Sequence, residues 1–248
     1  MHRPPPDPPA ITPDRFDAVL FDLDGVLTRT ASLHATAWAE LFDGYLRSVD
    51  PDAEPFTPAD YDTFVDGKPR YDGVRDFLAS RSIVLPDGSP TDPPGAATVC
   101  GLGNAKQAMF DSLLATRGVQ TFAGSIMLLD AVRAAGLRTA VVSSSKNCLA
   151  VITAAGIADR FDVRVDGHDV EDGGLAGKPD PATFLAAAQR LGVAPARAVV
   201  CEDALSGVAA GRAGGFGLVV GVDRAGQAAA LVEHGADVVV DDLAVLVR

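Results

Sequence analysis

The segment Ala18-Val-Leu-Phe-Asp-Leu-Asp24, followed by Gly25 and Val26, decides the fold class of this 248-residue chain. Its first four residues are all apolar, which is typical of a short strand buried on both faces of a parallel sheet. The run ends in two carboxylates one residue apart, and a chain that turns at Gly25 can bring both toward one pocket. Because Asp and Gly are also common at ordinary strand-to-loop transitions, this segment alone leaves its chemistry open.

The C-terminal half repeats this pattern of buried strands. Further apolar runs occur at 137–142, 198–201, 218–222 and 238–240. Alanine-rich segments with helical spacing lie at about 124–135, 146–155, 181–191, 205–213 and 225–234. The alternation of strands and helices predicts an α/β fold with a doubly wound parallel sheet of the Rossmann-like kind. Ligands of such sheets bind at the carboxyl ends of the strands.

Residues 31–110 show a different pattern, with helical spacing and many prolines. Leu33, Ala37 and Leu41 mark one face of a helix, and eight prolines lie between residues 51 and 94. Ser82–Leu85 is strand-like, and 81–104 has the composition of a long irregular excursion. We therefore expect a mainly helical cap domain inserted after the first strand. The expected division is a disordered proline-rich tail at 1–13, a core at 14–31 plus 112–248, and a cap at 32–111.

Composition excludes several classes of protein. The 21 basic and 33 acidic residues give a net charge of −12, whereas a nucleic-acid binder needs a basic face, so we expect no nucleic-acid partner. No apolar run approaches the roughly 18–20 residues of a membrane span, and no apolar signal segment follows the first residues. The three cysteines are widely spaced without a CxxC motif, which favours a reducing compartment, the cytoplasm.

Two pairs of acidic residues suggest chemistry at the strand ends. Of Asp22 and Asp24, one carboxylate can act as a nucleophile and the other as a general acid/base. Glu202 and Asp203 end a second apolar run, and adjacent acids suit a hard cation, Mg²⁺ above all. A helix N-cap at Asp203 is the alternative. Four acids converging on one site would repel one another unless a cation lay among them, and this favours the metal.

Two basic segments complete the candidate site. Ser143-Ser-Ser-Lys-Asn147 follows the strand at 137–142, where hydroxyls, a helix start and a cation can bind an anion. Ordinary serine N-capping is the alternative, although it explains neither Lys146 nor the run of three serines. Lys178, in a loop before a helix, can neutralise a nucleophile and a phosphate together, but a solvated surface lysine is the commoner role of such a residue.

The order of these four segments resembles the haloacid dehalogenase superfamily, in its phosphoryl-transferring branch. The family pattern is DxDx(T/V), then Ser or Thr after a strand, then Lys, then paired acids. The resemblance implies that Asp22 is the nucleophile, forming an aspartyl-phosphate, and that Asp24 is the general acid/base. It also implies that Ser143 and Lys178 hold the transferring phosphoryl group. The implied ligands of Mg²⁺ are Asp22, the main-chain carbonyl of Asp24, Glu202 and Asp203.

A closer resemblance, from about Asp17 to the last strand, is to the β-phosphoglucomutase-like subfamily. His34 falls where that subfamily has a histidine at the cap hinge, and Val65-Asp-Gly-Lys-Pro-Arg70 resembles the cap segment whose arginine grips the non-reacting phosphate. Lys106 lies near a cap lysine of the subfamily. The resemblance further implies contacts with phosphate and sugar from Ser144, Ser145, Lys146 and Asn147.

The resemblance implies an enzyme that interconverts β-D-glucose 1-phosphate and glucose 6-phosphate through an aspartyl-phosphate and a 1,6-bisphosphate. A mutase must hold two phosphates at once, and Arg70 with Lys146 supplies the second cationic site. The alternatives are a sugar-phosphate phosphatase and a non-catalytic phosphate-binding module. We expect a phosphorylated sugar as the substrate, and a monomer or weak homodimer. Arg29, where many relatives carry Asp, and the stretch 81–104 depart from the subfamily pattern.

Overall fold

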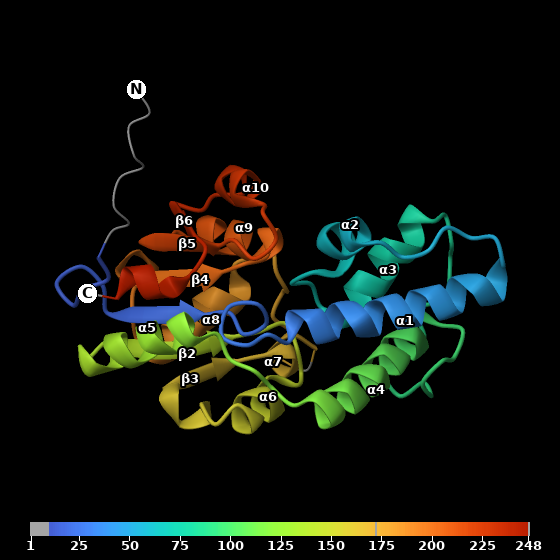
Figure 1. The fold of residues 1–248 in the computed structure, drawn as a ribbon, viewed down its shortest axis with the longest axis horizontal. Coiled ribbons are helices and arrows are strands. Elements are labelled where there is room, and N and C mark those ends of the chain that lie inside the picture. Colours follow the sequence, from blue (N-terminus) through green and yellow to red (C-terminus); the bar gives the residue numbers. More distant parts are fainter. Residues whose placement is uncertain (1–9, 172, 248) are drawn as a thin grey trace.

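The computed structural model describes residues 10–171 and 173–247, and the central feature of this part is a six-stranded parallel sheet. The strands lie in the order β3-β2-β1-β4-β5-β6 (Figure 1). The order reverses at β1, and the crevice beside such a reversal is the usual ligand site of a doubly wound sheet. The strands are β1 (Ala18–Phe21), β2 (Arg138–Val142), β3 (Val163–Val165), β4 (Ala198–Glu202), β5 (Leu218–Val222) and β6 (Val238–Val240).

Side chains of β1 alternate between the two faces of the sheet, and helices cover both faces. Val19 and Phe21 belong to the apolar cluster that contains α5, α6 and the 3-10 helix η4. Ala18 and Leu20 belong to the cluster on the other face, with α8, α9 and α10. All four are fully buried, which explains the uninterrupted apolar run and confirms the doubly wound α/β fold. The covering elements are α5 (Ala123–Ala134), α6 (Cys148–Ala154), α8 (Ala182–Leu191), α9 (Leu205–Ala213), α10 (Ala228–Glu233) and η4 (Leu243–Leu246).

A mainly helical insertion stands beside the sheet, between β1 and α5 (Figure 1). Its core is separate from those of the sheet and is rich in aromatic rings, with the Phe42 and Phe77 centroids 4.0 Å apart. Its elements are α1 (Ala31–Val49), α2 (Pro58–Asp60), the π-helix η1 (Tyr61–Val65), α3 (Arg70–Ser80) and α4 (Val99–Arg117). The expected cap boundary at residue 111 falls inside α4, and the division into two domains stays a prediction.

Two local expectations were wrong, and one strand was not predicted. Ser82–Leu85 is not a strand: Ser82 has a positive φ of 57° and Val84 is 92% exposed. The irregular excursion ends at Thr98 rather than at 104, because the Thr98 side chain accepts a hydrogen bond from the Gly101 amide and caps α4. Strand β3 was missed because it has three residues, and its central Arg164 interrupts the apolar pattern. Shorter elements complete the chain: η2 (Ala158–Arg160), α7 (Gly167–Glu171) and η3 (Pro195–Arg197).

The expected disordered tail lies mostly outside the described residues, since residues 1–9 are not among them. Ile11, within the expected tail, packs against the core of the sheet. None of the described helices combines the length and the apolar character needed to cross a lipid bilayer. The three cysteines are buried, and they form no disulfide bond among the described residues.

Candidate active site

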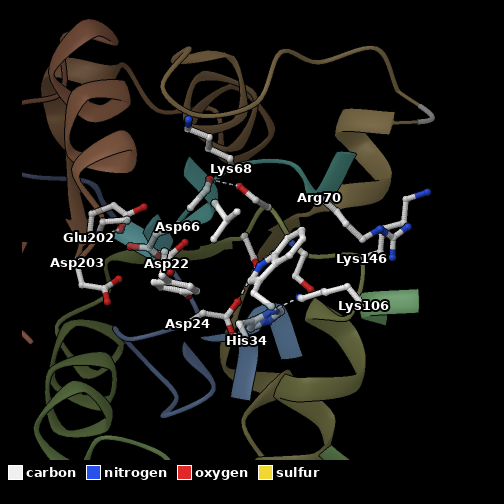
Figure 2. A pocket seen from close by; sticks show the side chains of 18 of the residues that line it. Asp22, Asp24, His34, Asp66, Lys68, Arg70, Lys106, Lys146, Glu202 and Asp203 are labelled. Atoms are coloured by element: carbon white, nitrogen blue, oxygen red, sulfur yellow. Dashed lines mark hydrogen bonds and ion pairs between the residues drawn. The ribbon is translucent and has the colours of Figure 1, made fainter. Parts of the chain in front are cut away.

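A pocket lies between the carboxyl ends of the central strands and the inserted helices (Figure 2). Asp22 and Asp24 follow β1, and Glu202 ends β4. From the insertion, α1 contributes His34 and α4 contributes Lys106, which face the acids across the pocket. The sheet and the insertion therefore both supply charged side chains to one cavity.

Asp22, Lys178 and Glu202 form a buried ionic triad on the sheet side. Lys178 Nζ donates to Asp22 Oδ1 at 2.5 Å and to Glu202 Oε1 at 2.7 Å. Burial and the charge of Glu202 raise the pKa of Asp22, and the Lys178 ammonium opposes this shift. Burial lowers the pKa of Lys178, but the two carboxylates outweigh it and raise that pKa above its usual value. Lys178 therefore stays charged and orients the Asp22 carboxylate.

Asp22, Glu202 and Asp203 form a carboxylate cluster with the chemistry of a cation site. One oxygen of each lies within 4.8 Å of the others. Both oxygens of Glu202 already accept hydrogen bonds: Oε1 accepts from Lys178 Nζ, and Oε2 accepts from the Ala204 amide at 2.9 Å. Burial and the neighbouring acids raise the pKa of Asp203. A divalent cation would offset this repulsion, and oxygen-only donors suit a hard ion, so these residues fit one.

Asp24, two residues after Asp22, has different hydrogen-bond partners. Its carboxylate accepts a hydrogen bond from Thr30 Oγ1, and its Oδ1 lies 3.5 Å from His34 Nε2. Burial raises the pKa of Asp24, but His34 and Thr30 outweigh this and leave the pKa below its usual value. The turn that places Asp24 requires Gly25, because its φ is +92° and a Cβ atom at this position would lie 1.8 Å from Asp203 Oδ2. Asp24 is therefore held ionised by neighbours from α1.

The insertion presents a buried basic pair to Asp24. Lys106 Nζ lies 2.5 Å from His34 Nδ1, and His34 stacks on Phe110 with ring centroids 4.0 Å apart. Burial lowers the pKa of Lys106 to about 7. Burial and the neighbouring Lys106 lower the pKa of His34 as well, against the attraction of Asp24. Burial therefore favours the uncharged form of both members of this pair.

The segment 65–70 joins the insertion to the sheet side. Ser144 Oγ donates to the Gly67 carbonyl at 2.7 Å, and Ser206 Oγ donates to the Asp66 carbonyl at 3.2 Å. Arg70 Nη1 donates to Gln107 Oε1 at 2.8 Å, and Arg70 lines the pocket. Figure 2 shows Arg70 and Lys146 close to each other, at the end of the pocket away from Asp22.

Most of the predicted site residues line this pocket. Two do not: Lys178 lies behind Asp22, and Asn147 precedes α6 with its side-chain nitrogen buried and without a hydrogen bond to any described residue. The predicted site residues that line the pocket are Asp22, Asp24, His34, Arg70, Lys106, Ser143, Ser144, Ser145, Lys146, Glu202 and Asp203. Their chemical roles stay predictions.

Sequence reasoning missed several residues of the pocket. Asp66 lines it, and burial with the charge of Glu202 raises the pKa of Asp66 to about 7. Asp66 lies inside the 65–70 segment, so the segment was found but this side chain was not weighed. Tyr61 and Gln107 carry no local signal, because only the packing of the insertion turns them toward the pocket.

Comparison with known proteins agrees with this geometry. Residues 16–215 match the sequence model of the haloacid dehalogenase-like hydrolases. The chain belongs to this family. A β-phosphoglucomutase of Mycobacterium bovis is 57% identical over 243 residues, which cover 94% of this chain and 92% of that protein. The chain is thus an enzyme of the haloacid dehalogenase-like family.

Solved structures of family members share the fold. A β-phosphoglucomutase from Clostridium difficile superposes with a TM-score of 0.74 at 24% identity, covering 92% of each chain. CbbY from Rhodobacter sphaeroides, solved in complex with xylulose-(1,5)-bisphosphate, has a TM-score of 0.69 at 25% identity. That match covers 92% of this chain and 95% of CbbY.

Proposed function

We propose that this enzyme is a Mg²⁺-dependent β-phosphoglucomutase, which interconverts β-D-glucose 1-phosphate and glucose 6-phosphate. The observation that carries the proposal is the separation of charged groups along the pocket: Asp22, which Lys178 contacts from outside the lining, lies at one end, and Arg70 lies at the other. A bisphosphate needs a binding site for each phosphate, and this pocket offers both. The 57% identity to the Mycobacterium bovis mutase supports the same activity.

Asp22 is the proposed nucleophile. One of its carboxylate oxygens attacks phosphorus of β-glucose 1,6-bisphosphate, a P–O(Asp22) bond forms, and the bond from phosphorus to the sugar oxygen breaks. Lys178 keeps the carboxylate in place, and Ser143 supports the transferring phosphoryl group. The 6-hydroxyl of β-D-glucose 1-phosphate then attacks the aspartyl-phosphate, and the P–O(Asp22) bond breaks as the bisphosphate forms. The bisphosphate turns around and gives its 1-phosphoryl group to Asp22, which leaves glucose 6-phosphate.

Asp24 is the proposed general acid/base. It donates a proton to the sugar oxygen that leaves phosphorus, and it accepts a proton from the hydroxyl that attacks the aspartyl-phosphate. Its lowered pKa favours the ionised form, which is the form that accepts the proton. Asp22 and Asp203, supported by Glu202, would hold the Mg²⁺ ion. When bound, the ion offsets the repulsion between the Asp22 carboxylate and an anionic phosphate.

The helical insertion is the proposed cap. Its hydrogen bonds to Ser144 and Ser206 hold it against the sheet side. Water excluded by such closure cannot hydrolyse the aspartyl-phosphate, so phosphate returns to the sugar. Arg70 grips the non-reacting phosphate, with Lys146 beside it (Figure 2). A phosphatase of sugar bisphosphates is the second candidate, because CbbY binds xylulose-(1,5)-bisphosphate in its solved complex.

The deciding experiment follows two products in one assay. The enzyme is mixed with Mg²⁺, β-glucose 1-phosphate and a trace of the 1,6-bisphosphate, and glucose 6-phosphate and free phosphate are measured together. The mutase predicts glucose 6-phosphate with little free phosphate. Free phosphate alone, from this substrate or from xylulose 1,5-bisphosphate, would contradict the mutase and establish a phosphatase.

Arg70→Ala tests the second phosphate site. We expect this variant to lose isomerisation by at least tenfold while residual phosphate release changes far less, since charge-assisted contacts to phosphate contribute about 1.5–3 kcal/mol. Arg75→Ala on the same helix is the matched control, because Arg75 is half exposed and pairs with Asp72 and Asp87. Equal loss of both activities in Arg70→Ala would refute the role given to Arg70.

A further inference from the structure

A second cavity lies where the insertion joins the sheet, and the proposed mechanism does not use it. Its volume is about 370 Å³. It is lined by Arg29, by the first turn of α1, by Arg117 at the end of α4, and by Arg224 after β5. Both chain connections between the insertion and the sheet contribute to its lining, with residues 29–32 from the first and residues 117–122 from the second. We call this space the junction cavity.

Arg224 is the most buried cation of the junction cavity, and part of it has no partner. Its Nε donates to the Gly25 carbonyl at 2.9 Å and its Nη1 donates to the Asp241 carbonyl at 2.7 Å. These two bonds fix the guanidinium in place. Its Nη2 is buried and has no hydrogen bond to any residue in the described part of the chain. A buried donor of this kind is costly unless a ligand or water accepts from it.

Phe122 gathers two like charges at the cavity. The guanidinium carbon of Arg224 lies 3.7 Å from the Phe122 ring centroid, and that of Arg29 lies 4.3 Å from it. Burial lowers the pKa of Arg224, and the positive charge of Arg29 lowers it further. The nearby acids act in the opposite direction and raise this pKa; they are Asp203, Asp241 and Asp242. Aromatic contact holds the two cations together although they repel each other. An anion between them would relieve the repulsion.

The first turn of α1 adds further donors. Thr30 precedes this 19-residue helix but does not cap it, because its Oγ1 donates to Asp24 and lies 2.6 Å from Thr28 Oγ1. The amides of Ala31 and Ser32 therefore keep the free donors of an uncapped helix, and both residues line the cavity. The positive end of the α1 dipole therefore lies at the cavity together with the arginine charges.

The charge balance of the junction cavity favours a negative ligand. Arg29, Arg117 and Arg224 form no ion pair with any described residue. Among the described lining residues the one acid is Asp203, and its carboxylate belongs to the cluster that fits a cation. Three guanidinium groups and the start of a helix thus line a cavity that has one carboxylate among its described residues. That carboxylate belongs to the proposed cation site, so it does not balance the positive charge.

We propose that the junction cavity binds a small dianion, a phosphate group or a dicarboxylate, between Arg224 on the sheet side and Arg117 with the α1 start on the insertion side. Such a ligand contacts the guanidinium groups that line the cavity and accepts from the amides of the first turn. A ligand bound there contacts both the sheet and the insertion at the place where they connect. It therefore restrains the movement of the insertion relative to the sheet. The site shares Asp203 with the substrate pocket but no other lining residue, and it does not depend on the proposed function.

Nuclear magnetic resonance tests this site without turnover. Backbone amide signals of Ser32 and Gln120 report the junction cavity, and those of Ser144 and Ser145 report the substrate pocket. Inorganic phosphate and succinate are titrated separately. We expect both probes to shift the junction signals saturably, with an affinity different from that at the substrate pocket. A response to one probe alone supports the site and identifies its ligand class. Unshifted junction signals with both probes would overturn the proposal.

Variants separate the two sites. Arg117→Gln and Arg29→Gln replace exposed arginines without touching the buried bonds of Arg224, so both proteins should fold. Each should weaken binding at the junction signals by about tenfold or more, because a charge-assisted contact is lost, and leave the substrate-pocket signals unchanged. Arg133→Gln on α5, an exposed arginine outside both cavities, is the control and should bind like wild type. Unchanged junction affinity in both test variants would refute the site.

Discussion

Replacement of Lys178 by Gln should destabilise the enzyme strongly, because it leaves two buried carboxylates without their cation. Lys178 is 2% exposed, Asp22 is 7% exposed and Glu202 is fully buried. Removing one partner of a buried ion pair costs about 3–5 kcal/mol. For a chain of this size, about 2–4 °C per kcal/mol gives a melting temperature lower by about 6–20 °C. Protonation of Asp22, whose pKa is already raised, favours the lower part of this range.

The assay is denaturant unfolding in Mg²⁺-free buffer, repeated with Mg²⁺. Lys68→Gln is the matched control, since its ion pair with Asp76 is partly exposed and should contribute about 0–1 kcal/mol. Added Mg²⁺ should restore part of the stability of Lys178→Gln, because the ion supplies positive charge to the same carboxylates. A loss below about 1 kcal/mol in Mg²⁺-free buffer, equal to that of Lys68→Gln, would refute the reasoning.

Three further predictions concern charge and closure. Burial lowers the pKa of Lys106 from its usual 10.5 to about 7 in the folded enzyme. Between these two pH values Lys106 is protonated in the unfolded chain but not in the folded one, so the free energy of unfolding rises with pH. The stability advantage of Lys106→Met over wild type, measured by urea unfolding, should therefore be largest below pH 7. Above pH 7 this advantage should shrink by at most about 1.4 kcal/mol per pH unit. A difference in stability that does not change with pH would contradict the lowered pKa of Lys106. Asp203→Asn should weaken Mg²⁺ binding at least tenfold by calorimetry, and unchanged affinity would remove Asp203 from the metal site. Ser144→Ala loses the bond to the Gly67 carbonyl, about 1 kcal/mol, and should raise KM several-fold with stability little changed; an unchanged KM would show that this contact does not hold the cap.

The strands and the acids at their ends could be predicted from local pattern. Phe21 and Leu20 face opposite sides of the sheet and are both buried, so β1 appears as a continuous apolar run. Asp22, Ser143 and Glu202 each follow or end such a run, and parallel strands bring their carboxyl ends to one edge. That rule predicted the residues on the sheet side of the pocket, whereas His34, Arg70 and Lys106 on the insertion side were predicted from the family resemblance.

Other features have no local signal. β3 has three residues and a charged centre, so it exists only because β2 offers a pairing edge. Ser82–Leu85 has strand-forming residues but no neighbouring strand to pair with among the described residues, and it stays irregular. Asn147 is only two residues beyond Ser145, yet its position at the start of α6 leaves it out of the pocket lining.

The sequence by itself determined the α/β class, the inserted helices and the carboxylates at the strand ends, because each of these follows from the spacing of neighbouring residues. Only the tertiary structure decided which charges meet. Lys178 reaches Asp22 across 156 positions and Lys106 reaches His34 across 72, and burial of these pairs sets their protonation. The junction cavity likewise exists only where Arg29, Arg117 and Arg224 come together. Burial and proximity across distant segments depend on packing, which no local pattern encodes.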